Sequence, residues 1–246
     1  MWTLWSGDVD RRALNVAGRD TGHVHDGPLT PSPAGAVVPG ENGRIVFVEF
    51  TNGAPSALET INPNGSHRET ILSSDIQEMD FPSWSPDGTK IVFNRIAADG
   101  TSSNLFMVNA DGKNLTKITR SSHSNEDAAW SPNGTRLVFA SNRSGNFDLW
   151  IKDLQTGRLR RLTTDPAQVL APDWSPDGTR IAFTSRRSGN LDVWVKDLRT
   201  NRARQITRDT ADDGWPTWSP DGSHIAFMSA RTGNSDIFVV AQTGPT

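Results

Sequence analysis

Residues 174–183 read WSPDGTRIAF, and three other segments of the chain repeat this pattern closely. These copies are WSPDGTKIVF at 84–93, WSPNGTRLVF at 130–139 and WSPDGSHIAF at 218–227. The tryptophans that open the copies are 46, 44 and 44 residues apart. A weaker copy, VPGENGRIVF, begins at Val38, one period before the first strong one. Self-similarity at a fixed period of this length predicts a repeat architecture, here with five copies.

Each repeat contains the signals of four short strands. In the copy around Trp174, one strand ends at the tryptophan and a Pro-Asp-Gly turn follows. Segments 180–185, 191–197 and 203–207 then supply runs of β-branched and aromatic residues between turn residues. Four strands in about 44 residues are typical of a β-propeller blade, and stacked blades bury each other's faces. The sequence therefore predicts an all-β fold, a single propeller of four-stranded antiparallel blades over residues 1–246.

The two ends of the chain fall inside blades. Residues 4–16 align with the third and fourth strands of a later repeat at 149–162, whereas the last repeat supplies only three strands. We therefore expect residues 1–17 to contribute closing strands to the terminal blade, in a ring of five or six blades. A start within a blade is also expected of a chain cut from a larger protein. The expected repeat blades are residues 36–73, 81–120, 128–164, 172–208 and 216–241.

Composition excludes several classes of protein. The net charge of −3 and the pI near 5.9 are not those of a globally basic nucleic-acid binder. No run approaches the ~18 apolar residues that a membrane helix needs. The absence of cysteine excludes disulfides, thiol catalysis and Cys-ligated zinc. Residues 1–20 lack the basic start and apolar core of a signal peptide. We expect no nucleic-acid partner and no membrane span.

The repeated P-x-W-S-P-D-G-x-x-I-A-F pattern, followed by S-G-N-x-D-x-W, resembles the WD-repeat-like blades of TolB-type β-propellers. The resemblance covers residues 36–241. It implies a propeller, usually of six blades, that serves in protein assemblies of the bacterial periplasm or exterior. It assigns no activity, because function on a shared fold depends on the particular site.

The loops that lead into the innermost strands surround one mouth of the central channel. They carry eleven acidic residues and a single basic one, Arg19, although the chain as a whole is almost neutral. Such a ring attracts cations or basic surfaces, whereas turn chemistry alone explains Asp but not the scarcity of Lys and Arg. We expect a protein or peptide partner with a basic or polar surface. The candidate ligand-binding residues are Glu78, Asp80, Phe81, Glu126, Asp127, Asp212, Asp213 and Trp215.

Two further groups of residues are candidates for a site. His23 and His25 have strand-like spacing and Asp26 follows, a donor set that suits a divalent metal, with His123 as a further ligand if the ring brings it close. No cofactor is expected, apart from this possible metal. Three periodic arginines, 44 residues apart, are each followed five residues later by an aspartate, and we expect them to bond within or between blades. They are Arg143, Arg187 and Arg231.

No catalytic motif is present: the chain lacks a nucleophile elbow, a P-loop and a dinucleotide fingerprint, so the catalytic residues are unknown. The sequence favours a non-enzymatic protein- or peptide-binding propeller with an acidic channel mouth. One alternative is a metal-dependent, carbohydrate-active lyase or hydrolase at the same mouth. Another is a structural or excised propeller without independent activity.

Overall fold

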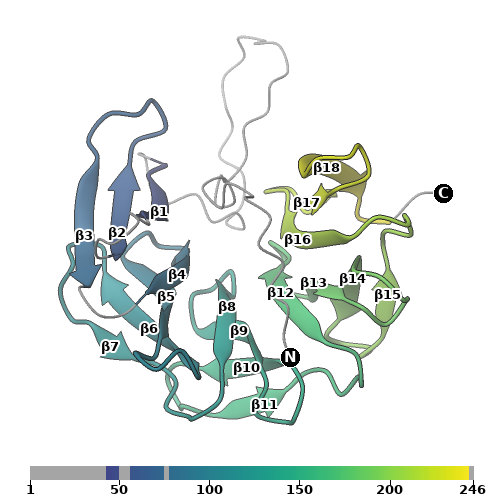
Figure 1. Cartoon of the computed structure of the whole chain (residues 1–246), viewed down its shortest axis with the longest axis horizontal. Helices are drawn as coiled ribbons and strands as arrows, with labels where there is room; N and C mark the ends of the chain where they lie inside the picture. Colours follow the sequence, from purple (N-terminus) through teal and green to yellow (C-terminus); the bar gives the residue numbers. More distant parts are fainter. Residues whose placement is uncertain (1–42, 50–55, 75–77, 244–246) are drawn as a thin grey trace.

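The computed structural model describes residues 43–49, 56–74 and 78–243. In this part of the chain the regular structure consists of eighteen strands, in five antiparallel sheets around a central axis (Figure 1). Each sheet is one blade, so the described residues form a five-blade propeller. The predicted all-β class and the propeller architecture are confirmed. The described residues include no helix that is long and apolar enough to cross a membrane.

The blades follow one another along the chain, with the innermost strand first in blades 2 to 5. Blade 1 contains β1 (Ile45–Glu49), β2 (Ser56–Ile61) and β3 (Glu69–Ser74). Blade 2 contains β4 (Met79–Trp84), β5 (Lys90–Ile96), β6 (Ser103–Asn109) and β7 (Thr116–Lys117). Blade 3 contains β8 (Asn125–Trp130), β9 (Arg136–Ser141), β10 (Asp148–Asp153) and β11 (Leu159–Arg161). Blade 4 contains β12 (Val169–Trp174), β13 (Arg180–Ser185), β14 (Asp192–Asp197) and β15 (Ala203–Gln205). Blade 5 contains β16 (Asp213–Trp218), β17 (His224–Ser229) and β18 (Asp236–Ala241).

The repeated Ser-Pro-Asp-Gly-Thr segment is a tight turn between the first and second strands. In blade 4 the Asp177 carboxylate accepts hydrogen bonds from Ser175 Oγ at 2.5 Å and Thr179 N at 3.0 Å. Burial raises the pKa of Asp177, but these bonds outweigh burial and lower the pKa to about 2. Gly178 has φ +69°, which favours glycine, and a Cβ there would meet Pro132 of the preceding blade at 3.7 Å. The turns therefore stack from blade to blade.

Packed clusters fill the four described junctions between blades. The periodic tryptophans are at most 9% exposed, and the phenylalanines that end the repeat motif are buried beside them. At the junction of blades 3 and 4, Trp174 and Phe183 pack on Val138 and Leu149 of the preceding blade. This arrangement confirms the core predicted from the repeat, because each blade buries its faces only against its neighbours.

The outer strand of blade 5 differs from its counterpart in blade 4. Ile237 and Val239 are 58% and 65% exposed, whereas Val193 and Val195, 44 residues earlier, are 0% and 5% exposed. The difference arises because blade 5 covers blade 4, while no described residue covers this face of blade 5. The closing strands expected from residues 1–17 lie outside the described residues, and that closure stays a prediction.

Candidate functional site at the channel mouth

The four described inner strands share a β-bulge at the end that faces the predicted mouth. The pairing register shifts at the same place in β4, β8, β12 and β16. The residue inside each bulge has a positive φ, between +47° and +55°, although none of the four is glycine. These bulge residues are Phe81, Asp127, Ala171 and Trp215. A bulge redirects side chains, and a left-handed conformation costs an L-residue free energy, so the strands keep a strained conformation at this mouth.

The sequence places these positions in loops, and the structure places them in the strands. Asp80, Phe81, Glu126 and Asp127 belong to β4 and β8, and Asp213 and Trp215 belong to β16. The acidic residues, glycine and proline in these segments break the alternation that marks a strand, and the bulge shifts the side-chain period. The physical consequence is that the candidate residues are fixed to the rigid inner wall of the propeller.

Side-chain oxygens hold three of the bulges by accepting hydrogen bonds from the bulge N–H groups. Phe81 N donates to the Asp80 carboxylate at 2.9 Å. Ala171 N donates to the Asp127 carboxylate at 3.1 Å, across the junction from blade 4 to blade 3. Trp215 N donates to Thr184 Oγ1 at 3.0 Å, across the next junction. Two of the predicted acidic residues therefore also stabilise the backbone of the mouth.

Two aromatic bulge residues are exposed at this mouth. Phe81 is 37% exposed and Trp215 is 43% exposed, in contrast to the buried periodic tryptophans. They belong to blades 2 and 5, on either side of the two blades that carry Asp127 and Ala171. Exposed aromatic rings on a rigid backbone offer large contact area at little cost in conformational entropy. These two rings are suited to anchor a partner.

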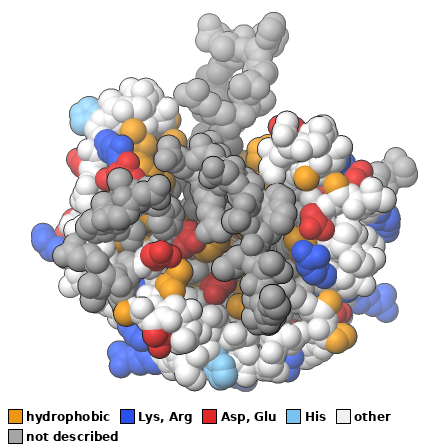
Figure 2. All heavy atoms as spheres, in the orientation of Figure 1, with side chains coloured by type: hydrophobic (Ala, Val, Ile, Leu, Met, Phe, Trp, Pro, Cys, Tyr) orange, Lys and Arg blue, Asp and Glu red, His pale blue; other side chains and the backbone are white. Residues whose placement is uncertain are grey.

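Three carboxylates from blades 2 and 3 lie near enough to interact electrostatically. Burial and the negative charges of Glu126 and Asp80 together raise the pKa of Asp127 to about 7, against the hydrogen bond from Ala171 N, which lowers it. Glu126 Oε1 accepts a hydrogen bond from Ser103 Oγ of blade 2 at 3.0 Å. Figure 2 shows acidic side chains near the middle of the visible face. We call Asp80, Glu126 and Asp127 the acidic triad.

The other predicted acidic residues are not part of this triad. Asp213 is completely buried and accepts two hydrogen bonds from Arg231, at 2.8 and 2.9 Å. Asp212 is exposed, accepts a bond from Leu191 N at 2.9 Å and lies 3.6 Å from Arg186. Glu78 is exposed beside the start of β4. Asp213 therefore supports the mouth from inside, while Asp212 and Glu78 lie on its surface.

The periodic arginines bond within their own blades, as expected, but not to the aspartates that follow them by five residues. Arg231 stacks on Phe238 with 4.6 Å to the ring centroid, and its Nε donates to Ser229 Oγ at 2.9 Å. Asp148, after Arg143, is instead buried and bonded to Thr163 Oγ1 at 2.8 Å. The arginines and the aspartates therefore recur five residues apart because each blade contains two separate hydrogen-bond networks, one around the arginine and one around the aspartate.

The metal candidates His23, His25 and Asp26 lie outside the described residues. Among the residues that the structure does describe, no group of three or more His, Asp or Glu side chains is arranged to hold a metal ion. His123, considered as a further ligand, is an exposed loop residue whose backbone bonds Ser121.

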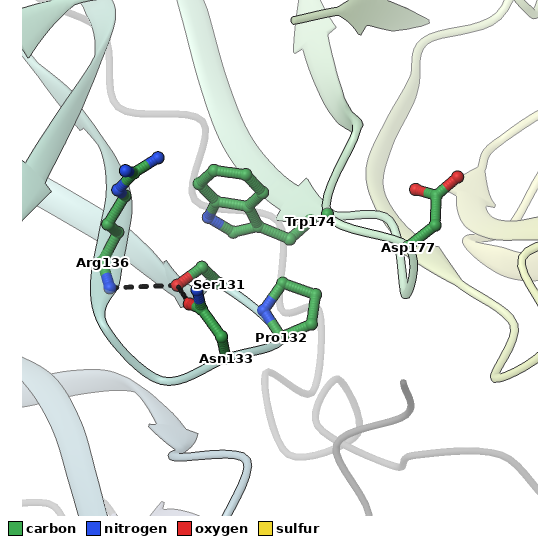
Figure 3. A pocket seen from close by; sticks show the side chains of 7 residues that line it. Ser131, Pro132, Asn133, Arg136, Trp174 and Asp177 are labelled. Carbon is green, nitrogen blue, oxygen red and sulfur yellow. Dashed lines mark hydrogen bonds between the residues drawn. The ribbon is translucent and has the colours of Figure 1, made fainter. Parts of the chain in front are cut away.

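Two hollows at the opposite end of the inner strands are products of the repeat. One, of about 210 Å³, lies between blades 3 and 4, where Trp174 faces Ser131, Pro132 and Arg136 (Figure 3). Its equivalent between blades 2 and 3 has a volume of about 360 Å³ and is lined by Trp130. Because the same turn residues form both, they follow from how the blades stack and do not mark a site by themselves.

Sequence reasoning missed three polar residues on the first two strands of the blades. Thr184 supplies the acceptor for the blade 5 bulge. Asp173 accepts bonds from Trp218 N at 2.9 Å and Thr217 Oγ1 at 3.2 Å, and burial raises its pKa to about 6. Asn94 is 2% exposed, stands opposite Asp80 in the sheet, and its Oδ1 has no hydrogen-bond partner among the described residues. Their only sequence signal is a polar residue where the repeat calls for an apolar or small one.

The five blades around a central axis define a β-propeller. The chain belongs to the TolB beta propeller domain family: the sequence model of this family matches residues 29–168 and 146–246. No match was found among proteins with curated descriptions.

Solved structures of several propellers are similar to this one. TolB from Acinetobacter baumannii is 25% identical, with a TM-score of 0.72 over 82% of this chain and 49% of that chain. The putative TolB from Agrobacterium tumefaciens is 21% identical, with a TM-score of 0.56 over 78% and 87% of the two chains. An oligogalacturonate lyase in complex with manganese is 18% identical, with a TM-score of 0.58 over 80% and 62%. The last two show the fold alone, and this chain spans about half the length of the Acinetobacter protein.

Proposed function

We propose that this propeller is a non-enzymatic binding module whose acidic mouth receives a basic segment of a protein or peptide. The observation that carries the proposal is the convergence of the acidic triad on rigid, bulged inner strands, next to the exposed ring of Phe81. A rigid scaffold holds these groups in place before binding, which lowers the entropic cost of association.

The two kinds of side chain have separate roles in this proposal. The acidic triad attracts and orients a Lys- or Arg-bearing segment, because charge complementarity acts mainly on association rate and orientation. Phe81 and Trp215 then hold the segment by stacking on aliphatic or cationic side chains. Glu78 and Asp212 extend the acidic surface, and Asp213 acts indirectly by fixing Arg231.

Family membership supports a setting in the bacterial envelope, and we propose a periplasmic or extracellular location with protein partners. Similarity to TolB structures supports the same class of partner. The enzymes among the fold relatives share only the architecture at their level of identity, so they add no support for a reaction at this mouth.

Equilibrium binding of two labelled peptides tests this function. A lysine-rich peptide is titrated into the full chain at low salt and compared with a glutamate-rich peptide of equal length. We expect only the lysine-rich peptide to bind, and the double variant Asp80→Asn/Glu126→Gln to weaken it about tenfold or more. Asp111→Asn, which removes one exposed acid at a turn on the opposite face, is the matched control and changes affinity less than about twofold. Equal affinity for both peptides, or for the double variant and the wild type, would overturn the proposal.

A further inference from the structure

Blade 2 departs from the repeat at the mouth end of its second strand. In blades 3, 4 and 5 the inner strand stands opposite a serine at this point, and an arginine follows two residues later. The serines are Ser141, Ser185 and Ser229. In blade 2 the residue at the serine position is Arg95 itself, opposite Met79. The blade therefore has an arginine but lacks the serine that accepts its hydrogen bond elsewhere.

The guanidinium of Arg95 nevertheless reaches the place that the periodic arginines occupy. It lies 5.3 Å from the ring centroid of Phe106, which pairs with Phe93 across the sheet. Arg143 lies 5.1 Å from Trp150, which pairs with Phe139 in the same way. The same stacking position is thus filled in blade 2 from a different point on the backbone.

Arg95 differs from the other three arginines in its acceptors. Arg231 has the Asp213 carboxylate at 2.8 Å, Arg143 has Ser141 Oγ at 2.9 Å, and Arg187 has the Asp165 carboxylate at 3.5 Å. The Nε of Arg95, in contrast, is buried and has no hydrogen-bond partner among the described residues. Burial lowers the pKa of Arg95, and no described acid offsets that effect.

The acid that stands nearby in other blades is also replaced in blade 2. Asp148 lies opposite Ser141 in blade 3, but the residue opposite Arg95 is the neutral Asn104, whose Oδ1 accepts from Thr119 Oγ1 at 3.0 Å. In blade 3 that acid pairs with Arg161 at 2.6 Å. Blade 2 therefore lacks the carboxylate that pairs with Arg161 in blade 3.

A second cation lies on the same ring. Lys117 pairs with Phe106 across the sheet, at the position that Arg161 holds in blade 3, and its Nζ is 5.6 Å from the ring centroid. Its side chain is exposed, and the described residues offer neither Lys117 nor Arg95 an ion pair with an acid. Two positive groups thus lie over one aromatic ring, and the described residues provide no counter-charge for them.

We propose that Arg95 and Lys117 bind a carboxylate group of a partner protein at the rim of the mouth. A guanidinium presents a planar pair of N–H donors that matches the two oxygens of a carboxylate, and an ammonium adds a point charge. Arg95 stands opposite the residue before Asp80, so the site borders the acidic triad. A partner that fits both surfaces carries an acidic side chain close to its basic segment. This site has the opposite charge preference from the mouth, so it does not depend on the function proposed above.

Thermal melting of the full chain tests the site, with sodium acetate as the probe and sodium chloride at equal ionic strength as the reference. A ligand that binds only the folded protein raises Tm in a saturable way. We expect acetate to raise Tm above the chloride curve in the wild type, and Arg95→Gln to abolish that difference. Lys117→Gln should weaken the apparent acetate affinity about threefold to tenfold, as expected for loss of one charge near a surface site. Arg120→Gln, which removes an exposed arginine of the same blade, is the matched control and keeps the full response.

Four results would overturn the proposal. The first is no difference between acetate and chloride in the wild type. The second is an equal acetate response in wild type, Arg95→Gln and Arg120→Gln. The third is a response to inorganic phosphate that exceeds that to acetate, which would assign the site to another oxyanion. The fourth is acetate binding that becomes about tenfold tighter in Asp75→Asn, which would show that an acid of this chain already fills the site. For each variant, Tm in acetate is compared with Tm of the same variant in chloride. A variant that is less stable in both salts therefore does not affect the result.

Discussion

At its bulges the mouth of the propeller has an acidic half, in blades 2 and 3, and an uncharged half, in blades 4 and 5, built on the same backbone. In blades 2 and 3 the residues at and just before the bulges include the acidic triad, whereas in blades 4 and 5 the corresponding residues are Leu170, Ala171, Gly214 and Trp215. All four bulges have the same register shift and a similar positive φ. The comparison teaches that the repeat specifies the shape of the mouth, while departures from the repeat specify its chemistry.

The bulges are also held by two kinds of acceptor. The Asp80 and Asp127 carboxylates accept the bulge N–H groups of blades 2 and 4, whereas the Thr184 hydroxyl accepts that of blade 5. A carboxylate acceptor depends on pH and a hydroxyl acceptor does not. Variants of the acceptors and of the bulge residues should therefore differ in stability, in binding and in their dependence on pH.

Loss of the hydroxyl acceptor should have the largest effect on stability. Thr184 is 3% exposed, so Thr184→Val leaves the Trp215 N–H without its acceptor in a partly buried place. We expect a loss of about 1–3 kcal/mol in the free energy of unfolding, independent of pH between 5 and 8. Chemical denaturation measures it, and Thr184→Ser, which keeps the hydroxyl, should lose less than half as much. A loss in Thr184→Ser that equals or exceeds the loss in Thr184→Val would show that the methyl group contributes at least as much as the hydrogen bond, and would contradict this account.

Removal of the aromatic anchor should weaken binding without slowing association. Trp215→Ala deletes a ring that is 43% exposed and carries no charge. We expect the lysine-rich peptide to dissociate about tenfold faster, equivalent to about 1.4 kcal/mol, while its association rate changes less than twofold. Stopped-flow fluorescence separates the two rates. A change confined to the association rate would contradict the separate roles of the two halves.

The acidic half should make stability depend on pH through Asp127. Its pKa in the folded protein is about 7, above the ordinary 3.8, so the folded state binds a proton more readily than the unfolded state. Stability therefore falls as pH rises from 3.8 towards 7, and is highest below that interval as far as this group is concerned. We expect Asp127→Asn to flatten this slope, by on the order of 1 kcal/mol once partial exposure is taken into account. Urea denaturation at several pH values measures it, and an unchanged slope would refute the assignment.

Relief of the backbone strain at the bulge should have the smallest effect on stability. Trp215 has φ +50°, a region that glycine enters freely and alanine does not. Trp215→Gly should therefore be more stable than Trp215→Ala by about 0.5–1 kcal/mol. The pair of variants removes the same ring, so their difference in Tm isolates the backbone term. A more stable alanine variant would mean that the bulge carries no strain.

The repeat made the fold predictable, and the same property hid the site. The strand predicted at 180–185 coincides with β13, and the Trp174 and Phe183 core positions are buried as expected. Both predictions depend on residues that recur in register, so a single sequence averages the signal over several copies. The blade order follows from the same repetition.

The geometry of the mouth was not predictable in this way. Asp80 and Asp127 were recognised as acidic residues near the channel, but their place in bulged strands depends on a left-handed residue that has no sequence signature when it is Phe, Asp, Ala or Trp. The unusual environment of Arg95 arises because the residues that stand opposite it, Met79 and Asn104, carry no charge. Such features arise from contacts across blades, which the spacing of residues does not reveal.

The most direct measurement of the central claim is the association rate of the lysine-rich peptide as a function of salt. Stopped-flow fluorescence is recorded between about 10 and 300 mM NaCl, over which the Debye length falls from ~30 Å to less than 10 Å. The acidic mouth predicts a rate that falls steeply with salt in the wild type and much less in Asp80→Asn/Glu126→Gln, with the two curves converging at high salt. A rate that does not change with salt, or equal slopes in the two proteins, would contradict the claim that the acidic triad steers a basic partner to this mouth.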